Sequence, residues 1–270
     1  MIWAGATGHC LQRDQSVALT TDQISQFHAR GYVTGIPLFR PGEVARFHDC
    51  YERLLPLLPP DVPISRVNWW HKRNRFLYDL CLDPRILDHA ECLLGPRFFL
   101  WGSQFFSKEP GDGTEVPWHQ DSHYWPLSPQ HSVTVFMAWT DCDSENAAMR
   151  VVPGTHRGGL LHHHTRTDGR AVLRDEIDDG EFDPADAVDL VLRAGQISLH
   201  HDAIVHGSGP NHSSRRRVGF TCRFSASEVL CDLAVWPNFR AYPARGVDAA
   251  GGNPIGEPPT AFAVPTGMFQ

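Results

Sequence analysis

The stretch QISLHHDAIVHGSGPNHSSRRRVGFTCRFSA, residues 196–226, decides the fold. Its two ends, QISLHHD and RVGFTCRFSA, are rich in strand-forming residues, and glycine, proline and asparagine between them are typical of turns. Many short strands separated by turns predict an all-β sandwich or barrel. Similar runs precede this stretch at FFLWGSQFFSKE (98–109), SVTVFMAWTDC (132–142), MRVVPGTH (149–156) and VDLVLRAG (188–195).

The residues before Phe98 predict helices with one short strand, YVTGI. One helix is expected to start after Thr21 as its N-cap and to stop at Gly31, and a second to begin near Pro41. A third, DPRILDHAECLLG (83–95), has an aspartate cap, a proline in its first turn and a glycine after its end. Helices and strands do not alternate, and no G-x-G-x-x-G or phosphate-binding loop is present, so a doubly wound α/β fold is disfavoured.

We expect a single domain over residues 1–270, because neither an internal repeat nor a clear domain boundary is evident. Its fold class is mainly β with flanking helices. The expected parts are a helical N-terminal support (about 1–95), a β core (about 96–225) with a polar insertion interpreted as a lid (about 157–187), and a loop-rich tail (226–270).

Composition excludes several classes of protein. With 41% hydrophobic and 20% charged residues the chain is an ordinary globular protein, and its net charge of −7 is not that of a nucleic-acid-binding protein. No apolar run approaches the roughly 18 residues of a membrane helix, and the N-terminus is a poor signal peptide. The seven cysteines contain no C-x-x-C pair, as in a reduced, cytoplasmic protein. We therefore expect a cytoplasmic protein with a small-molecule partner, no nucleic acid and no membrane; its oligomeric state is left open.

The stretch WHQDSHYWPL (118–127) holds a candidate metal chelate, His119-x-Asp121. If it is extended, alternate residues share one face, so His119 and Asp121 can bind one metal ion. A third ligand is available downstream among His200, His201 and His206, and His206 lies at a strand end beside a turn. Taken alone, H-x-D is common by chance.

Two histidines and one carboxylate leave three positions of a metal open, as in the facial triad of non-haem Fe(II) oxygenases. A carboxylate-bearing co-substrate would need a buried cation. Arg217, eleven residues after His206, begins a strand, and its planar guanidinium can grip a carboxylate with two hydrogen bonds.

At this point the sequence resembles the phytanoyl-CoA dioxygenase (PhyH-like) family of Fe(II)/2-oxoglutarate-dependent oxygenases. The resemblance rests on WHQDSHYWPLSP, AWTDCDSENAAMRVVPGTHRGG and LRAGQISLHHDAIVHGSGPNHSSRRRVGFTCRF, and it covers roughly residues 95–225. It implies a double-stranded β-helix (jelly-roll, cupin-like) core and the cofactors Fe(II), 2-oxoglutarate and O₂. The implied reaction is oxidative decarboxylation of 2-oxoglutarate to succinate and CO₂, coupled to oxidation of a substrate.

The resemblance also assigns residues. It implies the metal ligands His119, Asp121 and His206, and a 2-oxoglutarate site made of Arg217, Ser208, Trp139 and, more weakly, Gln104. Halogenating relatives replace the aspartate by a small residue; Asp121 is present here, which favours hydroxylation or a related oxidation.

The substrate residues are not identified by any motif. His123, Tyr124 and Trp125 follow the metal motif and are as consistent with packing of the barrel rim as with a substrate site. Asn68 and Trp70, in the segment SRVNWWHKRN, are candidates for a loop that caps the pocket or for an aromatic plug. The triple His162–His164 is expected outside the active site.

The main hypothesis is an Fe(II)/2-oxoglutarate hydroxylase acting on a small polar or secondary-metabolite substrate. The same cofactors would also serve desaturation, cyclisation or epimerisation. A metal-dependent jelly-roll isomerase or hydrolase that uses no O₂ is a second alternative, but it has no need of Arg217. A non-catalytic jelly-roll binding protein with a structural metal is disfavoured, because a structural site is normally closed by protein ligands and no fourth ligand is evident.

Overall fold

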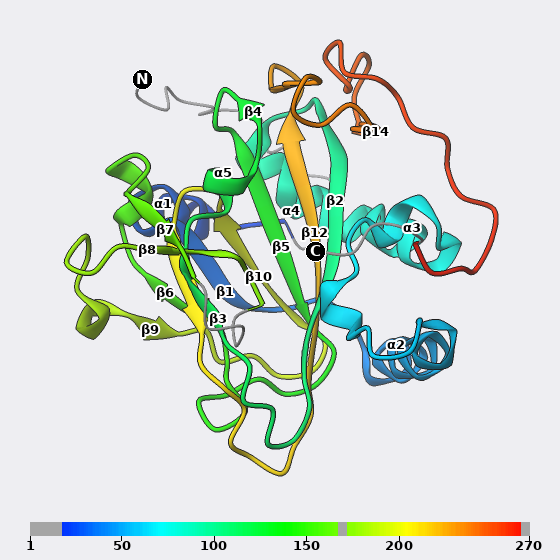
Figure 1. Cartoon of the computed structure of the whole chain (residues 1–270). Coiled ribbons are helices and arrows are strands. Elements are labelled where there is room, and N and C mark those ends of the chain that lie inside the picture. The colour runs from blue at the N-terminus through cyan, green and yellow to red at the C-terminus, as the bar shows by residue number, and fades with distance from the viewer. Residues whose placement is uncertain (1–17, 167–171, 266–270) are drawn as a thin grey trace.

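The computed structural model describes residues 18–166 and 172–265 (Figure 1). Residues 1–17, 167–171 and 266–270, which belong to the expected N-terminal support, insertion and tail, lie outside the described residues. Within the described ranges, none of the helices has both the length and the apolar character needed to span a bilayer.

Two antiparallel sheets form the centre of the molecule and confirm the predicted jelly-roll fold (Figure 1). The large sheet has the order β1 (Tyr32–Pro37), β10 (Gln196–His201), β5 (Ser132–Ala138), β12 (Arg217–Ala226), β2 (Phe98–Lys108) and β14 (Tyr242–Arg245). The small sheet has the order β3 (Val116–His119), β11 (Val205–Ser208), β6 (Arg150–Val152) and β9 (Val188–Asp189). Two further pairs are β13 (Leu230–Cys231) with β4 (Leu127–Ser128), and β7 (His163–Thr165) with β8 (Asp175–Ile177).

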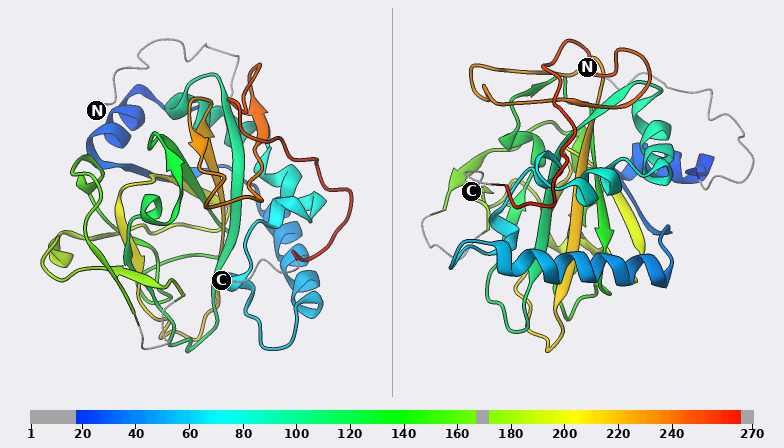
Figure 2. Two further views of the ribbon diagram at one scale, coloured as in Figure 1. Left: turned by 45° about the horizontal axis from the view of Figure 1, so that its top comes forward. Right: turned by 90° about the vertical axis from the view of Figure 1, so that its right-hand side faces the viewer.

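Helices cover the outer face of the large sheet, and the second view shows α2 running across its strands (Figure 2). The α-helices are α1 (Thr21–Arg30), α2 (Pro41–Leu54), α3 (Arg75–Cys81), α4 (Pro84–Leu94) and the single turn α5 (Asp121–Tyr124). Short 3₁₀ turns span Leu55–Leu57, Ile64–Arg66, Trp70–Lys72, Thr155–Arg157 and Pro184–Asp186.

The predicted helix signals are largely confirmed. Gly31 ends α1 in the left-handed conformation, and Asp83 caps α4 through the backbone N–H of Arg85. The N-cap of α1 is Thr20 and not Thr21, because Gln23 lies three residues after Thr20 and the two residues close a reciprocal capping box.

Expectations about the strands need correction at the tail and at VDLVLRAG. The tail is not all loop: Tyr242–Arg245 pairs with β2 at the edge of the large sheet, so the sheet extends past residue 225. The other edge is β1, which confirms the predicted short strand YVTGI. The insertion contains the β7–β8 hairpin, and only Val188–Asp189 of VDLVLRAG is a strand.

Alternation of side chains gives the large sheet two different faces. On β12, Val218, Phe220, Cys222 and Phe224 belong to the core shared with the helices. Arg217, Thr221 and Arg223, on the opposite face of the same strand, line a cavity between the two sheets. The functional side chains therefore gather on the face that the helices do not cover.

The close approach of residues 38–39 to the chain just before β10 predicts a sensitive position at Gly195, whose carbonyl accepts from the N–H groups of Leu38 and Phe39. Gly195 has φ +88°, and a Cβ there would lie 2.4 Å from the carbonyl oxygen of Phe39. Because neither backbone can move far, we expect Gly195→Ala to lower the free energy of unfolding by about 1–3 kcal/mol. Chemical denaturation measures this.

The matched control is Gly42→Ala. Gly42 is exposed at the start of α2, and a Cβ there meets nothing within 4 Å. Alanine favours helix, so this change should be neutral or stabilising by up to about 1 kcal/mol. Equal destabilisation by the two substitutions would contradict the argument.

Candidate functional site

Two histidines face each other where β3 and β11 pair. His119 and His206 are register partners, and their ring centroids are 4.0 Å apart. Gly207 makes this pairing possible, because a Cβ there would lie 2.9 Å from the carbonyl oxygen of Val116. The small sheet thus holds two buried imidazoles side by side, as the sequence predicts if both bind one metal.

Backbone carbonyls fix the tautomers of these histidines. Nδ1 of His119 donates to the carbonyl of Pro117 at 2.8 Å, and Nδ1 of His206 donates to that of Ile204 at 3.0 Å. In both rings the Nε2 lone pair is therefore available to a metal. Burial, together with the nearby His119, lowers the pKa of His206 well below its usual value, so the neutral, ligating form is favoured.

Asp121 completes the trio from a one-turn helix. It was expected in an extended stretch with His119, but β3 ends at His119 and Asp121 begins α5. The ligand atoms of His119, Asp121 and His206 still lie within 4.8 Å of one another, and all three residues are buried. Thr134 supports this geometry by donating to Asp121 Oδ2 at 3.0 Å.

The carboxylate of Asp121 is kept ionised. Burial raises the pKa of Asp121, but its contacts with His119 and His200 and the charge of Arg223 outweigh burial and hold the pKa well below its usual range. A neutral histidine pair beside an ionised carboxylate is a donor set that fits a divalent transition metal such as Fe(II). The three residues fit the implied metal.

Gln120, between the two predicted ligands, has a structural task that the sequence did not reveal. Its side-chain amide donates to the carbonyls of Gly159 and Ala203 and accepts from the N–H of Leu161. His163, which was expected outside the site, is nearby: its ring accepts from the Gln120 N–H at 3.4 Å and stacks on His123 at 3.9 Å. The insertion is thus fastened to the metal motif.

Arg217 is buried at one end of the cavity. Its Nη1 donates to the carbonyl of Ala147, and Lys108 lies close enough for their charges to interact. Burial, and then Arg217, lower the pKa of Lys108 to about 7. Lys108 donates to the carbonyls of Thr114, Ser208 and Gly209. Two buried cations at one place would be stabilised by an anion.

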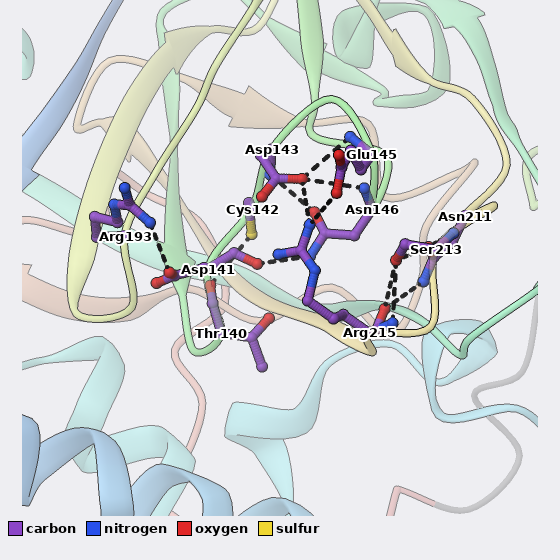
Figure 3. A network of polar contacts seen from close by, with 10 residues as sticks. All are labelled: Thr140, Asp141, Cys142, Asp143, Glu145, Asn146, Arg193, Asn211, Ser213 and Arg215. Atoms are coloured by element: carbon purple, nitrogen blue, oxygen red, sulfur yellow. Dashed lines mark hydrogen bonds and ion pairs between the residues drawn. The ribbon is translucent and has the colours of Figure 1, made fainter.

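The loop that carries Ala147 is held by a polar network (Figure 3). Arg215, two residues before Arg217, binds Asp143 at 2.9 Å and Glu145 at 3.0 Å. Asn146 donates to the carbonyl of Asp141 and accepts from the N–H of Asp143. The start of β12 and this loop are therefore tied together, which positions the carbonyl that meets Arg217.

The metal-ligand trio and Arg217 share one cavity, whose empty volume of about 390 Å³ includes space open to solvent. Ser208 lines it as well. The remaining lining residues are Phe106, Val116, Thr134, Phe136, Met149, His200, Gly207, Thr221 and Arg223.

Two residues expected in the co-substrate pocket lie elsewhere. Trp139 is fully buried in the helix-facing core, where it stacks on Phe47 at 5.1 Å. The reason is alternation along β5: Thr134 and Phe136 face the cavity, so Trp139 faces the helices. Gln104 is buried outside the cavity lining; its amide donates to the carbonyl of Ser65.

The five substrate candidates are dispersed. Trp70 is fully buried in the helix-facing core, and Asn68 forms a β-bridge with Gln104. Tyr124 donates to the carbonyl of Asp175 in the insertion at 2.6 Å, and His123 contacts the Asp175 carboxylate at 3.2 Å.

Trp125, the last of the five, lies over the guanidinium of Arg223, 5.3 Å from its ring centroid. No sequence motif indicated Thr134, Arg223 or Lys108, and His200 was considered only as an alternative third metal ligand. The only signal for Arg223 was its even spacing from Arg217 along one predicted strand.

Comparisons with known proteins point the same way. A family model described as phytanoyl-CoA dioxygenase (PhyH) matches residues 27–219. The peroxisomal phytanoyl-CoA dioxygenase of Mus musculus is 27% identical over 241 residues, which cover 79% of this chain and 70% of the mouse protein.

Two solved structures share the fold. The apo form of the non-heme monooxygenase ThoJ aligns with a TM-score of 0.76 at 27% identity, over 89% of this chain and 90% of that one. CytC3 with Fe(II) and alpha-ketoglutarate aligns with a TM-score of 0.66 at 21% identity, over 92% and 97%.

The hydrogen bond from Thr134 to Asp121 generates a prediction about metal affinity. Thr134→Val keeps the shape of this buried side chain but removes the donor that orients the carboxylate. We expect Fe(II) affinity to fall by about 10–100-fold, measured by anaerobic titration. Thr134→Ser retains the hydroxyl and should bind Fe(II) nearly as well as the unaltered protein; equal losses in both variants would contradict this role.

Proposed function

The chain belongs to the phytanoyl-CoA dioxygenase family and is an Fe(II)- and 2-oxoglutarate-dependent oxygenase, and we propose that it hydroxylates an unactivated C–H bond of a small polar metabolite or secondary-metabolite intermediate. Succinate and CO₂ are the co-products. In this proposal His119, Asp121 and His206 bind Fe(II), and Arg217 with Ser208 binds 2-oxoglutarate.

One observation carries the proposal: the three candidate ligands and the buried Arg217 open into the same cavity. Three protein ligands leave room on the metal for a co-substrate and O₂. An O₂-independent isomerase or hydrolase would need the ligands but not a buried arginine beside them, so Arg217 favours the oxygenase.

The protein's own contribution is to bind and orient. His119 and His206 present Nε2, because their Nδ1 atoms are bonded to carbonyls, and Thr134 orients Asp121. Arg217 fixes the distal carboxylate of 2-oxoglutarate at the far end, and the apolar Phe136 bounds the space between. When bound, Fe(II) with 2-oxoglutarate and O₂ supplies the oxidant that removes a hydrogen atom from the substrate.

The size of the cavity supports a small substrate. The empty space of about 390 Å³ includes space open to solvent, and it must hold both 2-oxoglutarate and the part of the substrate that reacts. The reaction type is tested by mass spectrometry of a metabolite mixture incubated with Fe(II), 2-oxoglutarate and O₂. Hydroxylation adds the mass of one oxygen atom, whereas desaturation or cyclisation removes two hydrogens and epimerisation leaves the mass unchanged.

The triple-arginine run provides a matched pair of variants for 2-oxoglutarate binding. Arg217→Ala removes a buried cation, and we expect the Kd for 2-oxoglutarate to rise at least about 30-fold, as when one member of a buried charge pair is lost. Arg216→Ala removes the neighbouring arginine, which binds Glu52 and Glu109 at the surface, and should leave this Kd unchanged.

The measurement is an anaerobic titration that follows the visible charge-transfer band of the Fe(II)–2-oxoglutarate complex. Retained Fe(II) affinity in Arg217→Ala shows that the variant is folded. If well-folded, Fe(II)-loaded unaltered protein gives no such band, the proposed function is wrong; if the two variants behave alike, the role of Arg217 is wrong.

A further inference from the structure

A row of three buried side chains crosses the large sheet beside Asp121. His200 on β10 is the register partner of Thr134 on β5, and Thr134 is that of Arg223 on β12. All three line the cavity, and neighbouring strands are about 4.8 Å apart. We call these three residues the polar row. It gives this end of the cavity a continuous edge of hydrogen-bonding groups next to the metal-ligand trio.

Arg223 brings a buried charge to the polar row with little to balance it. It is 8% exposed, and its Nη2 makes one long hydrogen bond, 3.3 Å, to Gln104 Oε1. Its Nε is buried and has no hydrogen-bond partner within residues 18–166 and 172–265. The carboxylate whose charge acts on it is Asp121, which already contacts Thr134 and the two histidines. An anion bound beside this buried guanidinium would therefore stabilise it strongly.

Among the described residues, Arg217 and Arg223 differ from several other arginines in their lack of ion-paired carboxylate partners. Elsewhere, Arg85, Arg215, Arg216 and Arg245 each contact two carboxylates. Both Arg217 and Arg223 line the cavity and leave a buried Nε without a hydrogen-bond partner within the described residues. One of these two cations is already assigned a ligand, the distal carboxylate of 2-oxoglutarate.

The two cavity arginines lie six residues apart on β12, Arg217 at its start and Arg223 three residues before its end. A fully extended strand would separate their Cα atoms by about 20 Å. Thr221 lies between them, and Phe136, its register partner on β5, also lines the cavity. The anion that Arg223 accommodates is therefore a different group from the one at Arg217.

Aromatic side chains pack around Arg223 outside the cavity lining. Trp125 lies over the guanidinium, and Trp101 packs edge-on against Trp125 with ring centroids 4.6 Å apart. A ligand that reaches Arg223 from the cavity meets the charged guanidinium, and the apolar surface near it is that of lining residues such as Phe136 and Met149.

We propose that Arg223 binds a carboxylate of the primary substrate, with His200 as a hydrogen-bonding neighbour, and that the substrate is a small organic acid whose apolar part lies against the apolar cavity lining, such as Phe136. The guanidinium fork matches a carboxylate in shape and charge. Because Arg223 lies near Asp121, an acid bound to Arg223 would have the C–H bonds next to its carboxylate close to the metal site. This inference rests on the proposed function and adds the substrate class to it.

The test measures binding of defined acids to Fe(II)- and 2-oxoglutarate-loaded protein under argon, by calorimetry. The probes are hexanoate, benzoate, phenylacetate and indole-3-acetate, each paired with its uncharged primary amide. We expect at least one acid to bind more tightly than its amide, and Arg223→Gln to weaken that acid by about 30-fold or more. The amide should lose far less, and Arg223→Lys should recover part of the affinity.

Two controls separate this inference from the proposed function. Arg216→Gln, on the surface, should leave acid binding unchanged. At saturating Fe(II), the 2-oxoglutarate affinity of Arg223→Gln should stay within about threefold of the unaltered protein, which also shows that the variant is folded; if Arg223→Gln does not fold, the same comparison is made with Arg223→Lys.

Three results would overturn the inference: no acid binds better than its amide, acid binding is unaffected by the Arg223 variants, or 2-oxoglutarate is weakened as much as the acid. The last result would assign Arg223 to the co-substrate. In all three cases the charge-transfer band can persist, so the oxygenase proposal is judged separately.

Discussion

The two-residue period of the central strands is the constraint on which the rest of the molecule depends. On β5 and β12 one set of side chains is apolar and packs against the helices, and the other set faces the small sheet. A shift of one residue in the pairing would exchange the two sets and place Arg217 and Arg223 among phenylalanines. The core therefore fixes the register, and the register delivers the cavity-facing side chains.

The buried charges in the cavity are only partly balanced by the chain itself. Two buried histidines, one ionised aspartate and two buried arginines line a single cavity. Such an arrangement costs folding free energy unless ligands complete it. The metal, the co-substrate and the substrate would then each supply charge that the folded chain lacks, so a large part of the binding energy comes from relieving this imbalance.

The sequence predicts a residue's position well when the residue belongs to a motif that lies on a single recognisable strand. His119 ends β3 and His206 lies on β11, so the sequence could place both on short strands, and it could place Arg217 at the start of the strand that begins eleven residues after His206. Trp139 was expected in the co-substrate pocket but lies in the helix-facing core. Its strand was predicted, but the face that Trp139 occupies depends on which side of the sheet the helices cover. Thr134 could not be found at all, because its partner Asp121 reaches it only after the chain turns into α5.

Both outer strands of the large sheet come from outside the motif-bearing region. β1 lies along β10, and β14 lies along β2. A fragment trimmed to residues 96–225 would keep every candidate ligand but would leave β10 and β2 with unpaired backbone groups. Exposed, flat edges of this kind join other chains. By covering these edges, β1 and β14 are expected to reduce self-association of the oxygenase core, although neither strand carries a candidate ligand.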